Sequence, residues 1–108
     1  MKVEVEFTEE VIEFILSLPA KMQAKIQRTI ELLKEFGYNL PEPHAKKVKT
    51  TSKIYELRVI QGNTICRLFY FHWKEKIHII TSGYMKKTNK LDKKQIEKAI
   101  TIMNKFKE

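Results

Sequence analysis

The sequence predicts an α+β fold formed by a single domain, residues 1–108. Three observations lead to this class. The first seven residues alternate like a strand, two helical patterns follow as far as Gly37, and three strand-like segments precede a last helical pattern. We therefore expect an N-terminal strand and a helical hairpin packed on an antiparallel sheet, with a C-terminal helix.

The two N-terminal helices are indicated by their end signals. Thr8 can cap the first helix, and the two glutamates after it suit the positive end of the helix dipole. Pro19 breaks this helix and can begin the second one, which Gly37 is suited to end. Because the join is so short, the two helices should form a hairpin.

The strands follow a loop at residues 39–44, where two prolines in three residues resist both helix and sheet. We expect strands at about 54–60, 64–73 and 76–83. The first two are joined by Gly62-Asn63, a two-residue hairpin signal. Counting back from this turn places Arg58 directly opposite Arg67.

The faces of the sheet depend on a second turn, expected at Lys74-Glu75, which pairs Arg67 with Ser82. In this register one face should pack on the helical hairpin and carries Tyr55, Leu57, Val59, Cys66, Leu68, Tyr70, Ile77, Ile79 and Thr81. The other face is more mixed and carries Glu56, Arg58, Arg67, Phe69, Phe71, His78, Ile80 and Ser82. A slip of one residue would exchange the faces, so this register is an assumption.

The C-terminal part is a basic loop, residues 83–91, and a final helix. Asp92 with Gln95 resembles a capping box. The apolar residues that follow, Ile96, Ala99, Ile100, Met103 and Phe106, have the spacing of an amphipathic helix.

Composition indicates a soluble, folded protein, with 43% hydrophobic and 31% charged residues. No apolar run approaches the length of a membrane span, and the N-terminus lacks the apolar block of a signal peptide. The single cysteine, Cys66, excludes an internal disulfide and fits a reducing compartment. We expect a cytoplasmic protein.

The net charge of +8 is unevenly distributed along the chain. Residues 1–43 carry five Lys and Arg against eight Asp and Glu, a net of −3. Residues 44–108 carry sixteen against five, a net of +11. This asymmetry indicates an anionic partner for the C-terminal part, with nucleic acid first, although small soluble domains also carry several net charges.

The facing arginines are the strongest chemical signal. Like charges opposite each other across strands are destabilising. A polyanion between Arg58 and Arg67 would reverse this effect, because the guanidinium fork matches phosphate. The sequence therefore indicates that a repulsive pair is kept for a ligand.

Further residues would extend this cationic site. Tyr84 should lie one step beyond Ser82 on the same face, and Lys86 and Lys87 should leave the strand end close to Arg67. Phosphodiester cleavage needs positive charge at the transition state and groups that move protons, which such residues could supply. For the lysines, a solvated basic edge is the simpler interpretation.

Other candidates are weaker. His44, His72 and His78 lack the spacing of a metal site, so no metal is expected. No glycine-rich phosphate loop is present, and no cofactor is expected. Phe71 and Trp73 could stack on bases, although aromatic residues in strands more often belong to the core.

The order of these features resembles the RelE superfamily of toxins from type II toxin–antitoxin systems, and most of all its phage-derived, HigB-like branch. The segments that carry the resemblance are Leu18-Pro19, Tyr55-Glu-Leu-Arg58, Arg67-Leu-Phe-Tyr70, Gly83-Tyr-Met-Lys-Lys-Thr88 and Ile96-Glu-Lys-Ala99. Each is short, but together they span nearly the whole chain in family order. The resemblance implies a curved antiparallel sheet, a helical hairpin on one side and a C-terminal helix.

The resemblance also implies an activity. Family members of this kind cleave mRNA in the ribosomal A site without a metal. The 2′-hydroxyl attacks the adjacent phosphate and leaves a 2′,3′-cyclic phosphate and a 5′-hydroxyl. A second implied partner is an antitoxin, HigA-like with a helix-turn-helix DNA-binding domain, in a toxin–antitoxin hetero-oligomer.

The resemblance implies roles for individual residues. Arg67 matches a catalytic strand arginine, and Lys86 and Lys87 match basic catalytic residues after the last strand. Arg58 matches a basic strand position, and the further candidate RNA or ribosome contacts are Lys46, Lys47, Lys90 and Phe71.

The chain also departs from the family. Tyr84 stands where this branch commonly has phenylalanine, so its proton-transfer role is inferred from its chemistry alone. No histidine follows residue 78, although some relatives use late histidines. Two alternatives therefore remain: a non-enzymatic toxin of the ParE type, which poisons DNA gyrase, and a basic nucleic-acid-binding module without turnover.

Overall fold

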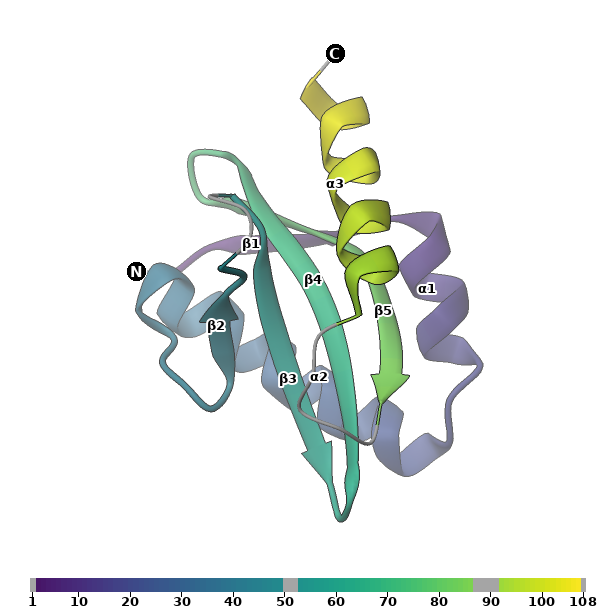
Figure 1. The fold of residues 1–108 in the computed structure, drawn as a ribbon. Helices are drawn as coiled ribbons and strands as arrows, with labels where there is room; N and C mark the ends of the chain where they lie inside the picture. Colours follow the sequence, from purple (N-terminus) through teal and green to yellow (C-terminus); the bar gives the residue numbers. More distant parts are fainter. Residues whose placement is uncertain (1, 50–52, 87–91, 108) are drawn as a thin grey trace.

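The computed structural model describes residues 2–49, 53–86 and 92–107, without the side chains of Lys86 and Lys107. It confirms the α+β class (Figure 1). The elements in chain order are β1 (Glu4–Phe7), α1 (Glu9–Leu16), α2 (Ala20–Phe36), a short 3-10 helix η1 (Gly37–Asn39), β2 (Ala45–Lys47), β3 (Tyr55–Gln61), β4 (Thr64–Lys74), β5 (Ile77–Lys86) and α3 (Lys93–Lys107). No helix in these ranges is long and apolar enough to cross a membrane.

The strands form one five-stranded sheet in the order β1-β5-β4-β3-β2. β3, β4 and β5 pair antiparallel, as expected, and β2 pairs antiparallel with β3, whereas β1 pairs parallel with β5 and makes the sheet mixed. An alternating pattern predicts a strand but does not show whether that strand pairs parallel or antiparallel with its neighbour, which explains this difference. β2 was not expected, because its three residues include two exposed lysines and it is held to the edge of β3 by backbone pairing.

The helix ends follow the predicted signals. The Thr8 side chain accepts a hydrogen bond from the Val11 backbone N–H at 3.1 Å and caps α1. Pro19 is the N-cap residue of α2, and Gly37 ends that helix with a φ of 54°, a conformation that favours glycine.

The two faces of the sheet are covered by different helices (Figure 1). The hairpin of α1 and α2 packs on one face and α3 packs on the other. The hairpin face buries Leu57, Val59, Cys66, Leu68, Tyr70 and Ile80 against the helices. The α3 face buries Phe69, Phe71, Ile79 and Tyr84 against Ile96, Ala99 and Met103.

The β4–β5 register differs from the prediction. Lys74 pairs with Ile77, so the turn lies at Glu75 and Lys76, one residue later than expected, and Lys76 has a φ of 66°. Two register shifts follow, between Phe69 and Tyr70 and between His72 and Lys74.

These shifts change which residues meet. Arg67 pairs with Tyr84, and the predicted pairing with Ser82 is wrong, because Ser82 pairs with Phe69. Ile79 and Ile80 also exchange their predicted faces.

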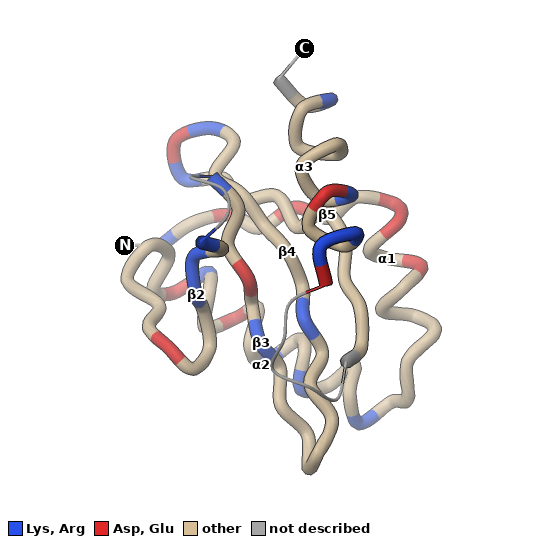
Figure 2. The backbone as a smooth tube through the Cα atoms, in the orientation of Figure 1, with Lys and Arg blue, Asp and Glu red and all other residues tan. Residues whose placement is uncertain are grey.

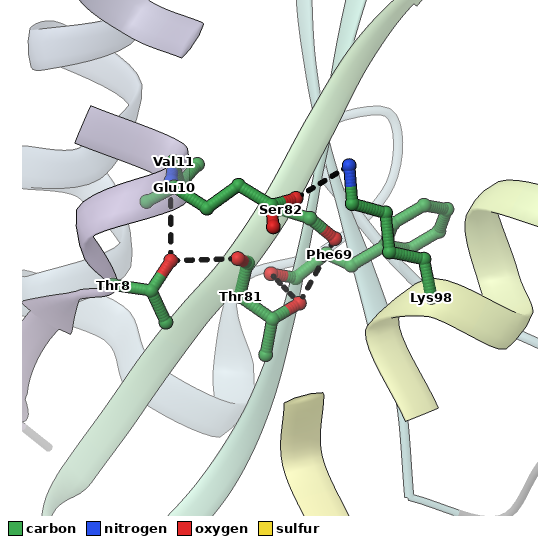
Figure 3. Close-up of polar contacts among 7 residues, drawn as sticks. All are labelled: Thr8, Glu10, Val11, Phe69, Thr81, Ser82 and Lys98. Carbon is green, nitrogen blue, oxygen red and sulfur yellow. Dashed lines mark hydrogen bonds and ion pairs between the residues drawn. The ribbon is translucent and has the colours of Figure 1, made fainter. Parts of the chain in front are cut away.

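The shift near Phe69 is a bulge at Thr81 of β5 (Figure 3). Phe69 pairs with Ser82 and Tyr70 pairs with Ile80, so Thr81 has no partner on β4 in the register. Its carbonyl oxygen accepts a hydrogen bond from Thr8 Oγ1 at 2.7 Å, and its own hydroxyl donates to the Phe69 carbonyl at 3.3 Å. The extra residue of this bulge therefore has its polar groups satisfied by the start of α1 and by β4. Figure 3 also shows Lys98 of α3 paired with Glu10 of α1, with Nζ 2.6 Å from Oε2.

Candidate active site

The β3–β4 hairpin brings the two strand arginines together as the sequence predicts. Gln61 pairs with Thr64 across the turn, and Gly62 takes a φ of 59° that suits glycine. In this register Arg58 pairs with Arg67. The predicted turn and the predicted pairing are both confirmed.

A carboxylate that the sequence analysis left unassigned lies with these arginines. Glu56 Oε2 is 2.9 Å from Arg67 Nη1, and Glu56 Oε1 is 3.4 Å from Arg58 Nε. Glu56 is 3% exposed. The expectation that the pair stays repulsive until a ligand arrives is therefore wrong, because one carboxylate bridges both guanidinium groups.

Arg67 is also far less accessible than expected. It is 1% exposed, whereas the Arg58 side chain retains 19% exposure. The face that carries Arg67 is the face on which α3 packs through Phe69, Phe71 and Tyr84. The expected open, concave site around Arg67 is thus closed in this structure.

Tyr84 lies opposite Arg67 on β5 and is 8% exposed. Its hydroxyl accepts a hydrogen bond from the backbone N–H of Asp92 at 3.2 Å, next to the start of α3. Burial raises the pKa of Tyr84, and the nearby Arg67 charge opposes that effect in part. The hydroxyl is therefore protonated at neutral pH and suited to donate a proton or hydrogen bond.

The basic residues expected around the arginines fall into two groups. Lys46 and Lys47 are exposed on β2, where they pair with Glu56 and Tyr55 of β3. Figure 2 shows the basic positions of β2, β3 and β4 on neighbouring strands, with an acidic position on β3.

The remaining expected lysines are not placed by the structure. Lys86 ends β5 opposite Ile65, and its side chain is not described. Lys87 and Lys90 lie outside the described residues.

Phe71 is not a base-stacking surface. It is 1% exposed, and its ring centroid lies 5.7 Å from that of Phe106 on α3. The expectation that it contacts RNA is wrong, because the amphipathic face of α3 needs this apolar partner. Trp73 is half-buried and packs on the same Phe106 ring.

The described residues contain no group of three His, Cys, Asp or Glu side chains placed to hold a metal ion. The site is instead a row of one carboxylate and two guanidinium groups across β3 and β4, and Tyr84 lies opposite Arg67 on β5.

The family described as phage-derived Gp49-like proteins (DUF891) matches residues 13–104. The chain belongs to this family. No curated protein sequence matches this Gp49-like chain significantly.

Solved structures show that this Gp49-like protein has the RelE fold. A mutant of the Escherichia coli toxin RelE in the free state aligns with a TM-score of 0.63 and 15% identity, covering 97% of both chains. The YoeB dimer of Staphylococcus aureus gives a TM-score of 0.57 and 19% identity over 76% of this chain and 94% of that one. RelE in the RelE–RelB complex of Pyrococcus horikoshii OT3 gives a TM-score of 0.56 and 20% identity over 84% and 100%.

Glu56 is the residue of this Gp49-like site that sequence reasoning missed, although a signal for it was present. Residues two apart on a strand share a face, so Glu56 must lie beside Arg58. It also pairs with Phe69, which places it diagonal to Arg67, within reach of long side chains.

Proposed function

We propose that this Gp49-like protein is the toxin of a type II toxin–antitoxin system, of the HigB-like branch, and an mRNA endoribonuclease that acts on the ribosome in the cytoplasm. The RelE fold supports the toxin assignment, since the Escherichia coli protein of this fold is the toxin RelE. The RelE–RelB complexes of two archaea support an antitoxin partner. We infer a HigA-like antitoxin with a helix-turn-helix domain.

The observation that carries the nuclease proposal is the pairing of Arg58 with Arg67 in the Arg58–Glu56–Arg67 cluster, where Arg58 stays partly exposed. Burying such charges stabilises a fold poorly compared with apolar side chains of similar volume. The cluster keeps one net positive charge, and the exposed Lys46 and Lys47 lie on the adjacent strand.

The proposed reaction needs no metal. The 2′-hydroxyl loses its proton and attacks the adjacent phosphorus, the bond to the 5′-oxygen breaks, and that oxygen takes up a proton. The products are a 2′,3′-cyclic phosphate and a 5′-hydroxyl. Positive charge is needed where the phosphate gains negative charge, and a fixed donor lowers this barrier most where water is excluded.

We assign the residues to these steps as follows. Arg58 is the partly exposed guanidinium and makes the first phosphate contact. Arg67 is buried and supplies positive charge below the surface of the site. It contacts the phosphate only once the phosphate has replaced Glu56 as its partner. Tyr84, Lys86 and Lys87 are the candidates for proton transfer, and the ribosome supplies the alignment of the RNA.

Mapping of transcript ends tests this proposal. The chain is expressed from a tightly controlled promoter, with and without Arg67→Ala, and new 5′ ends inside reading frames are mapped. We expect ends in phase with codons that vanish in the variant. Growth arrest with unchanged transcript ends would rule out the nuclease.

This experiment needs a folding control, because Arg67→Ala alone leaves Glu56 buried without that partner. The double variant Glu56→Leu/Arg67→Met removes both charges at similar volume and should fold. It should also be inactive. Arg58→Ala, at the more exposed end of the cluster, gives a third inactive variant without a buried orphan charge.

The burial of Arg67 against Glu56 favours a second candidate function, a gyrase-poisoning toxin of the ParE type. An arginine that serves the fold alone would be buried and paired in this way. This candidate predicts that a folded Arg67 variant still arrests growth and induces a DNA-damage response, with transcript ends unchanged. A basic module that only binds RNA predicts neither new ends nor a damage response.

A further inference from the structure

A small cavity lies on the hairpin side of the sheet, away from the arginines. Its volume is about 130 Å³, and its lining includes Tyr38, Tyr55, Tyr70, His78, Lys46 and Lys47. Tyr70 and Arg67 point to opposite faces of β4, because they are three residues apart and β4 pairs with β3 without a shift from Arg67 to Tyr70. The cavity is therefore separate from the site proposed for cleavage.

The walls of the cavity are aromatic. The rings of Tyr55 and Tyr70 are stacked, with centroids 5.5 Å apart and planes 21° apart. Tyr38 approaches His78 edge-on at 5.2 Å and is 53% exposed. An aromatic ring that is half in solvent at the edge of an aromatic cavity can cover a planar ligand.

His78 provides an unused polar edge in this cavity. It is 1% exposed, and neither Nδ1 nor Nε2 makes a hydrogen bond of good geometry within the described residues, although the Ile77 backbone is near enough to act on its pKa. Burial and the neighbouring His72 lower the pKa of His78 to about 4. The ring is therefore neutral at pH 7, with one N–H donor and one acceptor nitrogen.

We propose that this cavity binds one nucleobase, stacked on Tyr38 and hydrogen-bonded along its edge to His78, with its phosphate on Lys47, which pairs with Tyr55 on the same face. At about 130 Å³ the cavity is slightly smaller than one of about 150 Å³ that holds a benzene molecule, so it has room for one six-membered ring, and the rest of the nucleotide would lie outside it. Stacking on tyrosine and pairing along the base edge are how proteins hold unstacked bases. The exposed Lys47 favours a nucleotide over an uncharged aromatic ligand or a partner's aromatic side chain.

Two ligands could supply this base and phosphate: a free mononucleotide or an unstacked nucleotide within RNA. This site goes beyond the proposed cleavage and does not depend on it. It would give the protein a second contact with RNA on the face that α1 and α2 cover.

Nuclear magnetic resonance on the purified full chain tests the proposal. The ring signals of His78 and Tyr38 are followed while AMP, GMP, CMP, UMP or a short single-stranded RNA is added, with ribose 5-phosphate as the ligand without a base. We expect shifts with at least one mononucleotide or with the RNA, and none with ribose 5-phosphate. RNA alone shifting the signals would identify the source as RNA.

Matched variants complete the test. Tyr38→Ala should weaken binding by about tenfold, the effect of losing one stacked base, and Tyr38→Trp should retain it. Phe36→Ala removes an aromatic ring that is 44% exposed and does not line the cavity, and it should bind like the parent protein. Unchanged His78 signals with every nucleotide, or equal shifts with ribose 5-phosphate, would overturn the proposal whatever the outcome of the cleavage experiment.

Discussion

A single carboxylate sets the electrostatics of the β3–β4 face. Glu56 contacts Arg67 at 2.9 Å and Arg58 at 3.4 Å and is almost fully buried. Without Glu56 two guanidinium groups would face each other in a medium that screens charge poorly. The fold therefore holds the arginines in place with Glu56, and a phosphate must compete with that carboxylate to reach Arg67.

Glu56→Ala should destabilise the protein by about 3–5 kcal/mol, because it leaves the buried Arg67 charge without its carboxylate. The double variant Glu56→Leu/Arg67→Met should recover most of this loss, since no charge remains buried at that position. Chemical denaturation of the three proteins measures the free energy of unfolding. A loss below about 1 kcal/mol in Glu56→Ala would show that Arg67 is not held by this ion pair.

At the scale of the elements, α1 and the sheet pack closely together at Gly83 of β5. A Cβ atom built there would lie 2.5 Å from Leu68 Cδ2, 2.8 Å from Phe14 Cε2 and 3.0 Å from the Arg67 carbonyl oxygen. Two of these neighbours are on β4, and the third is on α1. The absence of a side chain at Gly83 thus lets α1 lie flat against the sheet beneath the candidate site.

Gly83→Ala should destabilise the protein by about 1–3 kcal/mol, the usual cost of forcing a methyl group into a packed core. Hydrogen exchange of the α1 amides should rise, because that helix must move outward. Gly62→Ala is the matched control, since a Cβ there meets nothing within 4 Å and the cost arises from its φ of +59° alone. Equal exchange of α1 in both variants would contradict this account of the packing.

Elements with strong local signals could be predicted from the sequence, and contacts set by distant residues could not. Thr8, Pro19, Gly37 and the Gly62-Asn63 turn act on their own neighbours, so the helix ends and the Arg58–Arg67 pairing were correct. The β4–β5 register was wrong because it depends on a bulge at Thr81 that is satisfied by the start of α1. No pattern within either strand contains that information.

The candidate site was predicted less well than the fold for the same reason. Alternation gave the face on which Arg67 lies, but its exposure depends on where α3 packs, more than twenty residues later in the chain. Phe71 was wrongly predicted to contact RNA for the same reason, because the ring that buries it, Phe106, belongs to α3. Both errors concern burial by an element whose position no local signal fixes.

On the scale of the whole molecule, the N-terminal part of the chain is acidic and the C-terminal part is basic, and both parts contribute to one sheet. Residues 1–43, which include α1 and α2, carry a net −3, and residues 44–108 carry a net +11. Figure 2 shows basic positions on β2 at one edge of the sheet and acidic positions on α1. An RNA strand should therefore meet the β2 edge in preference to the α1 side.

Salt dependence measures this preference. Each phosphate contact made by a lysine contributes about 0.7 to the slope of log affinity against log salt for single-stranded RNA. Lys46→Gln/Lys47→Gln should therefore reduce the slope by about 1.4 relative to the parent protein, because both lysines are exposed on β2. Lys21→Gln/Lys105→Gln removes the same charge from exposed positions on α2 and α3 and should leave the slope nearly unchanged. If the two double variants lowered the slope equally, RNA would respond to net charge alone, and the β2 edge would have no special part in binding it.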